Sequence, residues 1–425
     1  MYLHTIIENS RFLRLGIDAS NLKIISMPDE KLFQMGKQSL INKTKVKKKK
    51  ILVFIDWFLP GYRAGGPIQS CANLIEHLKD DFEFLVVTRN KDIGDSVPYD
   101  KIISNEWIIH PSGARVFYFS DTFLSFKNIK RILLTEEYDV VYLNSLFSLY
   151  FTIFPLIVLK LYRRLQQVVL ATRGVLGEGA LSIRPVKKYL FIYLSRIVGL
   201  FSKIGWHATS DLERKEIKKF FGASAKITVA TNLPKKEVIS YAERKKEPNS
   251  LSLVFLSRIS KKKNLSAVLD YLLNISGSII LHVYGPIEDA QYWKYCLEKA
   301  RELPENIKFS YQGIVNPQQI NSIFKQYHFM ILPTLHENYG HVIFESLSVG
   351  CPVIISDTTP WLGLEEKKAG WDISLADKGQ FIAIISKCVQ MGQEEYDELS
   401  RSAFEYAERI VNDKDSMEQS RNLFL

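Results

Sequence analysis

The chain has 425 residues, of which 46% are hydrophobic and 24% are charged, and its formal net charge is +10. This length exceeds what one hydrophobic core usually serves, so we expect two domains, and the composition is ordinary for a soluble globular protein. The positive charge favours anionic partners, namely nucleic acid, acidic lipid surfaces or phosphorylated small molecules, although a basic surface also serves solubility alone.

Cysteine spacing and hydropathy indicate in which cellular compartment the protein is expected. The four cysteines are far apart and form no CxxC pair, so we expect neither a disulfide framework nor a structural zinc site, and a reducing cytosol is the simplest compartment. Met1–Ile25 has scattered charges and no apolar core, which argues against a signal peptide. The longest apolar run, Leu146–Leu159, is short of the ~20 residues that span a bilayer, so we expect a buried helix, with contact to a membrane face left open.

Residues 1–50 show no sustained periodicity, and we expect a basic, poorly ordered extension. Its last eight residues, Lys43–Lys50, include six lysines, and such a block repels itself. Two interpretations fit this block: a solvated tail, or an electrostatic tether to anionic lipid worth about 1 kcal/mol per basic residue.

The residue pattern changes at Ile51, where an apolar run begins that is typical of a strand buried on both faces. A glycine-rich loop (PGYRAGGP) and a helical pattern follow, and strand candidates then alternate with helices as far as Asn232. Such alternation predicts a parallel sheet covered by helices, so residues 51–232 form the first expected domain. Within it, Val186–Lys203 mixes aromatic, aliphatic and basic residues, which fits either a buried helix or a helix lying on a membrane surface.

The same alternation restarts after a charged stretch and predicts a second domain at residues 233–408. Its strand candidates are LSLVFLSRI, SIILHVYG, IKFSYQG, HFMILP and PVIIS. After Trp371 we expect only helices, the last of which, at 409–425, should pack back on the first domain. The expected fold is therefore α/β, with two Rossmann-like doubly wound parallel sheets facing each other across a cleft, and ligands in such sheets bind outside the carboxyl ends of the strands.

The stretch Pro333–Ser356 carries the most informative pattern, because two carboxylates with seven residues between them lie in a strand–loop–helix–strand unit. Glu337 lies in a polar, glycine-containing turn after the strand HFMILP, and Glu345 lies inside a helix that ends at Gly350. A loop and helix of this kind aim backbone N–H groups and the positive end of the helix dipole at one point, where phosphate binds well. The stretch predicts a site for an activated phospho-compound such as a nucleotide sugar.

The motifs in this order resemble those of the retaining glycosyltransferases with two Rossmann-like domains, the GT-B fold, in family 4 (glycosyl transferases group 1). The resemblance covers about Lys50 to the C-terminus and rests on AGGP, the basic pair in SRISKKKNL, the strand ends YG and QG, and the ENYGHVIFE block. It implies a hexosyltransferase that needs no metal ion or other cofactor and moves a sugar from a nucleotide diphosphate sugar to a polysaccharide or lipid-linked oligosaccharide. It also implies a cytoplasmic protein, with peripheral contact to the inner, anionic face of the membrane as an open alternative.

The resemblance also implies roles for residues at matching positions. Arg258 and Lys263 would hold the donor diphosphate and stabilise the leaving group. Glu337 would lie against the donor sugar, and Glu345 would accept hydrogen bonds from the ribose hydroxyls. The further substrate-binding residues that we expect are Gly65, Gly66, Arg173, Gly285, Asn338, Tyr339 and Gly340.

Histidine is where the sequence departs from the family pattern. Many relatives have a histidine after a first-domain strand near the reaction centre, but this chain has Arg173 there, and Asn144 and Ser145 at the end of the preceding strand. Arginine cannot act as a general base, so the group that takes the acceptor proton stays open. His207, at the end of another strand, is more typical of a satisfied core residue than of a catalyst.

Other classes of function also have to be weighed. A nucleotide-sugar epimerase on the same fold would need more acid–base residues than the motifs supply. A non-catalytic sugar-nucleotide or glycan-binding protein would have less need of the intact carboxylate pair and basic pair. A nucleic-acid binder has no support, because the chain lacks a recognition motif of interleaved aromatic and basic residues. The only DxD-like string, Asp413–Asp415, is expected to be a solvated turn rather than a metal site.

Overall fold

The computed structural model describes residues 47–181, 185–236 and 240–425, so most of the expected N-terminal extension lies outside the described residues. The first strand, β1 (Lys49–Phe54), begins before the apolar run because its lysines find partners. The backbone N–H of Lys50 donates to the carboxylate of Asp139 (2.7 Å), and the ammonium of Lys49 donates to the carbonyl of Phe424 (3.2 Å). These two lysines therefore belong to the folded chain.

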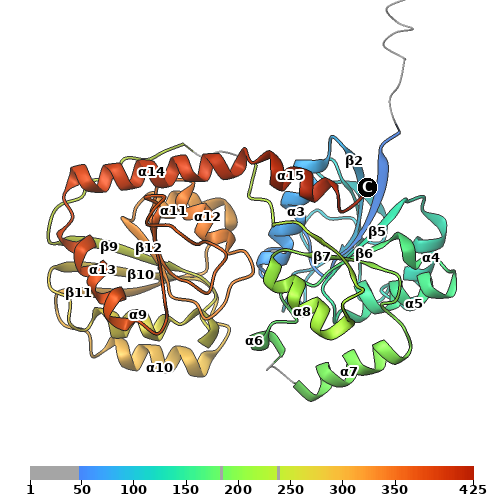
Figure 1. The fold of residues 1–425 in the computed structure, drawn as a ribbon, viewed down its shortest axis with the longest axis horizontal. Helices are drawn as coiled ribbons and strands as arrows, with labels where there is room; N and C mark the ends of the chain where they lie inside the picture. Colours follow the sequence, from blue (N-terminus) through green and yellow to red (C-terminus); the bar gives the residue numbers. More distant parts are fainter. Residues whose placement is uncertain (1–46, 182–184, 237–239) are drawn as a thin grey trace, which may run out of the picture. The chain divides into compact units, whose positions relative to one another are not determined.

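The first sheet has eight strands (Figure 1). They are β1, β2 (Phe82–Arg89), β3 (Trp107–Ile109), β4 (Arg115–Phe119), β5 (Val140–Asn144), β6 (Val168–Ala171), β7 (Gly205–Ala208) and β8 (Lys226–Val229). Their order in the sheet is β3-β4-β2-β1-β5-β6-β7-β8, and every neighbouring pair is parallel except β3 with β4. The sequence gave no sign of β3, because three residues at a sheet edge are too few for a periodic signal.

Helices cover both faces of this sheet. They are α3 (Gly66–Leu78), α4 (Phe126–Thr135), a π-helical turn η3 (Leu149–Ile153), α5 (Phe154–Leu161), a 3₁₀ turn η4 (Leu165–Gln167), α6 (Glu178–Leu181), α7 (Pro185–Ile197) and α8 (Asp211–Phe221). Alternate residues of β1 enter two separate buried clusters. Val53 packs in the cluster that includes Leu74 of α3, whereas Phe54 packs in the cluster that includes Ile129 of α4. This alternation explains why β1 is apolar at every position from Ile51 to Phe54.

The second sheet has six strands, and all neighbouring pairs are parallel. They are β9 (Ser250–Leu256), β10 (Ser278–Tyr284), β11 (Ile307–Gly313), β12 (Phe329–Leu332), β13 (Val353–Ser356) and β14 (Gly370–Ile373), in the order β11-β10-β9-β12-β13-β14. The expectation of only helices after Trp371 was wrong, because Trp371 lies within β14, which pairs with β13. The predicted fold class, two parallel-sheet α/β domains, is confirmed.

The end of the chain returns to the first sheet (Figure 1). The helices of the second half are a 3₁₀ turn η5 (Lys261–Lys263), α9 (Leu265–Leu272), α10 (Ala290–Ala300), a 3₁₀ turn η6 (Pro317–Gln319), α11 (Ile320–Phe324), α12 (His341–Leu347), α13 (Lys378–Gln390), α14 (Gln393–Val411) and α15 (Lys414–Arg421). Helix α15 contacts α3. The ring of Phe424 lies 5.4 Å from that of Phe82 and 5.3 Å from that of Tyr142, within the core beneath α3.

Strand order fixes where each sheet can bind a ligand. In the second sheet, β9, β10 and β11 follow one another toward one side, whereas β12, β13 and β14 follow one another toward the other side. The direction of winding therefore reverses between β9 and β12. In the first sheet it reverses between β1 and β5. Loops diverge at the carboxyl ends of such strands, which makes these points the usual ligand sites. We propose the domain boundary between β8 and β9, as expected near Asn232. None of the helices in the described part of the chain is long and apolar enough to cross a membrane.

Candidate active site

Two loops meet at the switch point of the second sheet, one after β9 and one after β12. The backbone N–H of Leu335 and the hydroxyl of Thr334 both donate to the carbonyl of Lys262, at 2.8 and 3.0 Å. Lys262 belongs to η5, which also carries Lys263. These hydrogen bonds therefore fix the backbone of the basic turn to the loop that carries Glu337.

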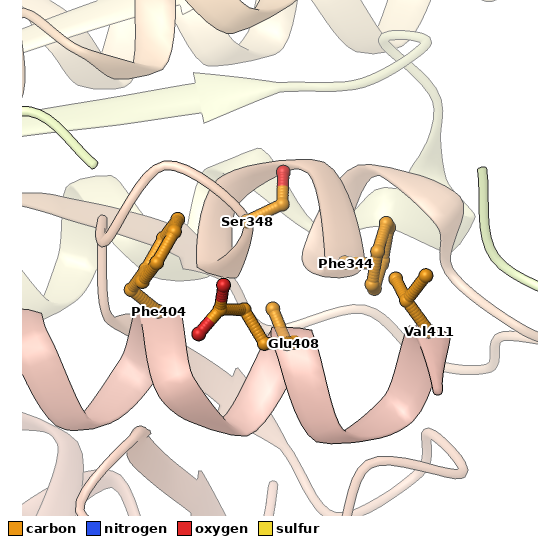
Figure 2. A pocket seen from close by; sticks show the side chains of 6 residues that line it. Phe344, Ser348, Phe404, Glu408 and Val411 are labelled. Carbon is orange, nitrogen blue, oxygen red and sulfur yellow. The ribbon is translucent and has the colours of Figure 1, made fainter. Parts of the chain in front are cut away.

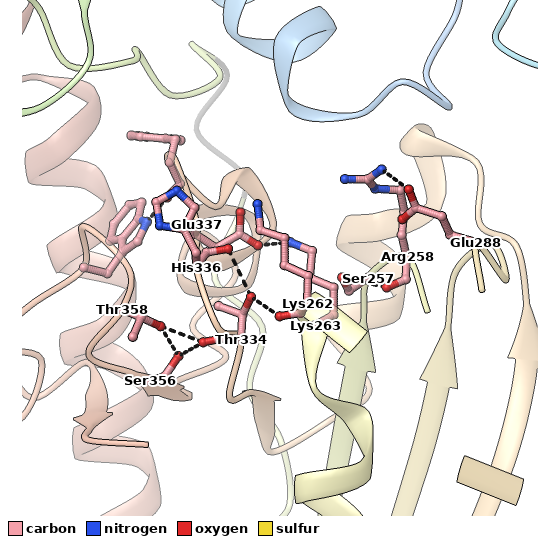
Figure 3. Close-up of polar contacts among 12 residues, drawn as sticks. Ser257, Arg258, Lys262, Lys263, Glu288, Thr334, His336, Glu337, Ser356 and Thr358 are labelled. Atoms are coloured by element: carbon pink, nitrogen blue, oxygen red, sulfur yellow. Dashed lines mark hydrogen bonds and ion pairs between the residues drawn. The ribbon is translucent and has the colours of Figure 1, made fainter. Parts of the chain in front are cut away.

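Hydroxyl groups at the end of β13 hold the loop after β12 in place (Figure 3). Ser356 and Thr358 each donate to the carbonyl of Thr334, both at 2.6 Å. The backbone N–H of Glu337 donates to the carbonyl of Thr358 (3.2 Å). The sequence gave no sign of this support, because it depends on β13 lying next to β12.

Lys263 and Glu337 form an ion pair in which the ammonium donates to Oε1 of the carboxylate (Figure 3). Only 11% and 13% of the two side chains is exposed. Burial lowers the pKa of Lys263, and the positive charges of Arg258 and Lys262 lower it further. Contact with the Glu337 carboxylate opposes these effects, because it favours the charged amine. An incoming anion would compete with Glu337 for this ammonium.

Arg258 lies on the same loop as Lys263 but has a different partner. Its guanidinium is 3.0 Å from the carboxylate of Glu288, and both side chains are more than 40% exposed. Figure 3 shows Arg258 directed toward Glu288 rather than toward Glu337. The structure therefore brings Lys263 and Glu337 together but not Arg258. Exposed ion pairs are weak, so Arg258 can exchange Glu288 for an anionic ligand with little loss of free energy.

Gly285 has a structural reason to be glycine. It follows β10 with a φ of +128°, and a Cβ on it would lie 2.0 Å from the carbonyl oxygen of Ser257. A side chain here would push apart the ends of β9 and β10 and displace Arg258, the residue after Ser257. Contact between Gly285 and a ligand stays a prediction.

The loop between Glu337 and α12 has backbone donors without protein partners. Among the described residues, no acceptor is bonded to the N–H groups of Asn338, Tyr339 and Gly340. Gly340 has a φ of +79°, and a Cβ on it would lie 2.8 Å from the side chain of Ile343, so the turn into α12 requires glycine. Consecutive N–H groups of this kind bind anions, which is the chemistry predicted for these three residues.

The side chains of this loop are engaged in protein contacts. Tyr339 is 6% exposed, and its ring packs 5.4 Å from that of Trp361. Oδ1 of Asn338 is hydrogen-bonded to the hydroxyl of Thr209 (2.6 Å), just after β7. Both residues would therefore meet a ligand through their backbone rather than through their side chains.

Glu345 lies on α12 between the buried residues Phe344 and Ser346. Burial raises its pKa to about 7, whereas the charge of Lys235 acts in the opposite direction. Helix α12 packs on α14, and the space between them is too narrow for a water molecule (Figure 2). This space is lined by Phe344, Ser348, Phe404, Ala407, Glu408 and Val411. The packing gives Glu345 a fixed backbone from which its carboxylate can accept hydrogen bonds.

The predicted glycine loop adjoins the loop after β12. Gly65 has a φ of +74°, and no side chain caps the start of α3. A Cβ on Gly66 would lie 4.0 Å from the ring of His341, and this ring is hydrogen-bonded to the hydroxyl of Ser70 on α3 (2.8 Å). Burial lowers the pKa of His341 to about 3, so the ring is neutral. Sequence patterns did not indicate the contact between Ser70 and His341.

Arg173 was expected to bind substrate, as a cation for a phosphate or an acidic acceptor, but the structure places it differently. Its guanidinium donates to Asn144 (2.8 and 3.1 Å), to Asn232 (2.6 Å) and to the hydroxyl of Tyr142 (2.9 Å). Arg173 is 8% exposed, and its backbone is left-handed with a φ of +55°. These bonds occupy most of its donors, so the geometry gives no support to ligand binding and favours a structural role.

His207 is a core residue that belongs to the same hydrogen-bond network as Arg173. Its Nδ1 is hydrogen-bonded to the hydroxyl of Tyr142 (2.7 Å) and its Nε2 to the carbonyl of Ala230 (2.8 Å). Burial lowers the pKa of His207 to about 4, and the charge of Arg173 lowers it further. The neutral, fully bonded ring matches the interpretation of His207 as a satisfied core histidine.

Glu213 is a further buried residue that the motifs did not single out. Its carboxylate accepts hydrogen bonds from the N–H groups of Gly174 and Thr209, both at 2.6 Å, and from the hydroxyl of Thr172. The bonds join the ends of β6 and β7. The sequence did hold a signal, because Ser210–Glu213 (SDLE) has the spacing of a capping box, and the hydroxyl of Ser210 accepts from the N–H of Glu213 (3.2 Å).

The arrangement suits an anionic ligand with an adjoining polar group. The ammonium of Lys263 is paired with the carboxylate of Glu337 in the loop after β12, and three N–H groups without partners among the described residues follow Glu337. The exchangeable guanidinium of Arg258 lies on the neighbouring loop, next to Glu288. Within the residues that the structure describes, no group of three or more His, Cys, Asp or Glu side chains is placed to hold a metal ion.

Comparison with known proteins gives a family model and a set of solved structures. Residues 213–404 match the model of the glycosyl transferases group 1. Anabaena HepE in complex with UDP and glucose has a TM-score of 0.63 at 16% identity, covering 88% of this chain and 98% of that one. Sucrose-phosphate synthase from Thermosynechococcus elongatus has a TM-score of 0.63 at 14% identity, covering 89% and 98%. The lipopolysaccharide outer core galactosyltransferase WaaB, in its apo form, has a TM-score of 0.56 at 15% identity, covering 88% and 98%.

Comparison with curated protein sequences gives no match. Identities of 14–16% show a shared fold and no more. The family model covers the second sheet together with α8, which includes every site residue from Arg258 to Glu345. A little less than half of the chain therefore matches the glycosyl transferases group 1 model, and the described chain has the GT-B fold.

Proposed function

We propose that the protein is a retaining, family 4 glycosyltransferase of hexosyltransferase type. It transfers a sugar from a nucleotide diphosphate sugar to a polysaccharide or lipid-linked oligosaccharide and needs no metal ion. The observation that carries the proposal is the Lys263–Glu337 pair, followed by the N–H groups of Asn338–Gly340, which have no partner among residues 47–181, 185–236 and 240–425. A diphosphate requires cations and N–H donors, and a sugar next to it requires a hydrogen-bonding carboxylate.

In the proposed reaction, Lys263 moves its ammonium from Glu337 to the diphosphate, and Arg258 joins it after leaving Glu288. The bond between the anomeric carbon and the diphosphate oxygen breaks, and its electron pair leaves with the diphosphate. The acceptor hydroxyl oxygen forms the new bond on the same face. Its proton passes to the departing diphosphate, so the step needs no protein base.

Glu337, released from Lys263, accepts hydrogen bonds from the sugar and holds it for attack. Glu345 accepts from the two ribose hydroxyls. Gly65 and Gly66 bring the backbone of the first domain close to the phosphate or the acceptor. Closure of the two domains over the donor would exclude water and limit its hydrolysis.

The solved structures suggest which donor to try first. HepE is described with UDP and glucose, so UDP-glucose is the first candidate for this chain. WaaB is described as acting on the lipopolysaccharide outer core, which favours a lipid-linked acceptor at the membrane. In this proposal the protein works in the cytoplasm against the inner membrane face.

A thermal-shift panel of UDP-, GDP- and ADP-sugars tests the proposal. A ligand present at about 100 times its dissociation constant adds about 2.7 kcal/mol to the free energy of unfolding, so one base should raise the melting temperature clearly. The Lys263→Met variant is the matched control and should lose that shift. If no nucleotide sugar shifts the melting temperature, the proposed donor class is wrong. Turnover of the donor without any acceptor would instead indicate an epimerase.

A further inference from the structure

Helix α7 is exposed rather than buried, which decides between the two interpretations of Val186–Lys203. Of its residues, only Ile192 and Ser195 are buried. Six of its large apolar side chains are at least half exposed, and Val186 reaches 78%, whereas Phe191 and Ile192 pack against the core. The exposed ones are Val186, Tyr189, Leu190, Tyr193, Leu194 and Ile197, followed by Val198. An apolar surface of this size marks an interaction site on a soluble protein.

The end of α5 continues this surface. The ammonium of Lys160 donates to the carbonyl of Val198, so the last turn of α5 lies beside the end of α7 (Figure 1). Leu161 and Tyr162, the next residues, are 71% and 45% exposed. We call the exposed apolar residues of α7, with Val198, Leu161 and Tyr162, the α7 face.

The segment that carries the α7 face is strongly basic. Residues 140–210 contain nine lysines and arginines and a single acidic residue, Glu178, although the whole chain has 46 acidic residues. Four of these cations are exposed near the ends or along the side of the face: Arg163, Lys187, Arg196 and Lys203. Although Asp211 at the start of the neighbouring helix α8 is also exposed, a segment this long with one carboxylate is suited to a negatively charged partner.

We propose that the α7 face docks on the surface of an anionic lipid bilayer. Apolar and tyrosine side chains in a helix that also carries lysine and arginine are what an interfacial helix needs, since the former enter the boundary of the acyl chains and the latter meet the headgroups. A second copy of the chain fits less well, because a two-fold contact would place the two basic rims against each other.

Docking by the α7 face extends the proposed function but does not depend on it, because it involves no residue of the donor site. It would hold the first domain against the bilayer, since the α7 segment connects β6 to β7 of the first sheet. A lipid-linked acceptor would then reach the enzyme from the membrane surface.

Vesicle co-sedimentation of the full chain tests the proposal. Equimolar phosphatidylglycerol and phosphatidylcholine vesicles should bind the protein, and pure phosphatidylcholine vesicles should bind it at least about tenfold less. The triple variant Tyr193→Ser, Leu194→Ser, Ile197→Ser should lower the affinity for the anionic vesicles at least about tenfold, because three apolar side chains no longer leave water. Lys187→Glu with Arg196→Glu should also weaken binding to anionic vesicles.

The matched control is Val97→Ser, Ile103→Ser, Ile109→Ser, which removes three apolar side chains of similar exposure in and before β3, at the other end of the sheet. This control should bind vesicles like the unchanged protein. If the α7 triple variant bound the anionic vesicles as tightly as the unchanged protein, the proposal would be overturned. So would light scattering that shows the unchanged protein as a dimer and the triple variant as a monomer. The thermal shift with a nucleotide sugar should be the same in all variants, which separates this proposal from that of the donor site.

Discussion

Arg173 at the edge of the first sheet and Lys263 at the edge of the second are equally buried cations, 8% and 9% exposed. Their partners differ. Arg173 donates four hydrogen bonds to neutral oxygen atoms of three residues that belong to the same domain. Within the part of the chain that the structure describes, the side chain of Lys263 has one partner, the carboxylate of Glu337, which is followed by N–H groups that have none.

The comparison shows that burial alone does not separate a structural cation from a functional one. A cation whose donors are mostly used within the protein fixes the fold around it, whereas a cation paired with one carboxylate can exchange that carboxylate for a ligand. We therefore infer that the carboxyl ends of the first-sheet strands are held rigidly by Arg173 and Glu213. The proposed catalytic groups lie at the carboxyl ends of the second-sheet strands. The predictions below separate these two roles.

Lys263→Met should have the largest effect. We expect transfer to fall about 10²–10³-fold, because one charged donor to the developing negative charge is lost. Initial rates with saturating donor measure this. Lys262→Met is the matched control, since the side chain of Lys262 is exposed and only its carbonyl supports the loop. Equal losses in both variants would indicate a general effect of positive charge rather than a specific role of Lys263.

Arg173→Met should instead destabilise the fold. We expect the free energy of unfolding to fall by about 3 kcal/mol, because buried oxygen atoms of Tyr142, Asn144 and Asn232 lose their donor. Denaturant unfolding measures the loss, and the nucleotide affinity of the folded variant should be unchanged. A stable variant with a raised KM for the acceptor would restore the acceptor-binding role first expected for Arg173.

Glu345 should make nucleotide binding depend on pH. Its pKa is raised to about 7 by burial, so the carboxylate that would accept from ribose is formed above that pH and lost below it. The affinity for the nucleotide should fall about tenfold from about pH 8 to about pH 6, because below pH 7 the free protein must lose one proton from Glu345 before the nucleotide binds. Calorimetric titration at both pH values measures this. Glu345→Gln should bind weakly at both, and an unchanged pH dependence in that variant would assign the proton to another group.

The fold and the main loops could be predicted from the sequence because their signals are local. Buried parallel strands are apolar at every position, as in β12 and in the part of β1 from Ile51 on, whereas β14 begins at Gly370 and contains Asp372, so its pattern is weak. Contacts between distant segments gave no local signal. The pairing of Arg258 with Glu288, the bonds from Ser356 and Thr358, and the internal partners of Arg173 all depend on which strands lie side by side. The roles assigned to the site residues stay predictions.

Glu337→Gln tests the central claim most directly, because it keeps the shape of the side chain and removes only its charge and part of its acceptor capacity. We predict that transfer falls by at least about 10²-fold, while the dissociation constant of the free nucleotide diphosphate stays within about threefold. Parallel measurement of transfer rate and nucleotide binding on one protein preparation gives both values. Unchanged transfer by Glu337→Gln would contradict the account.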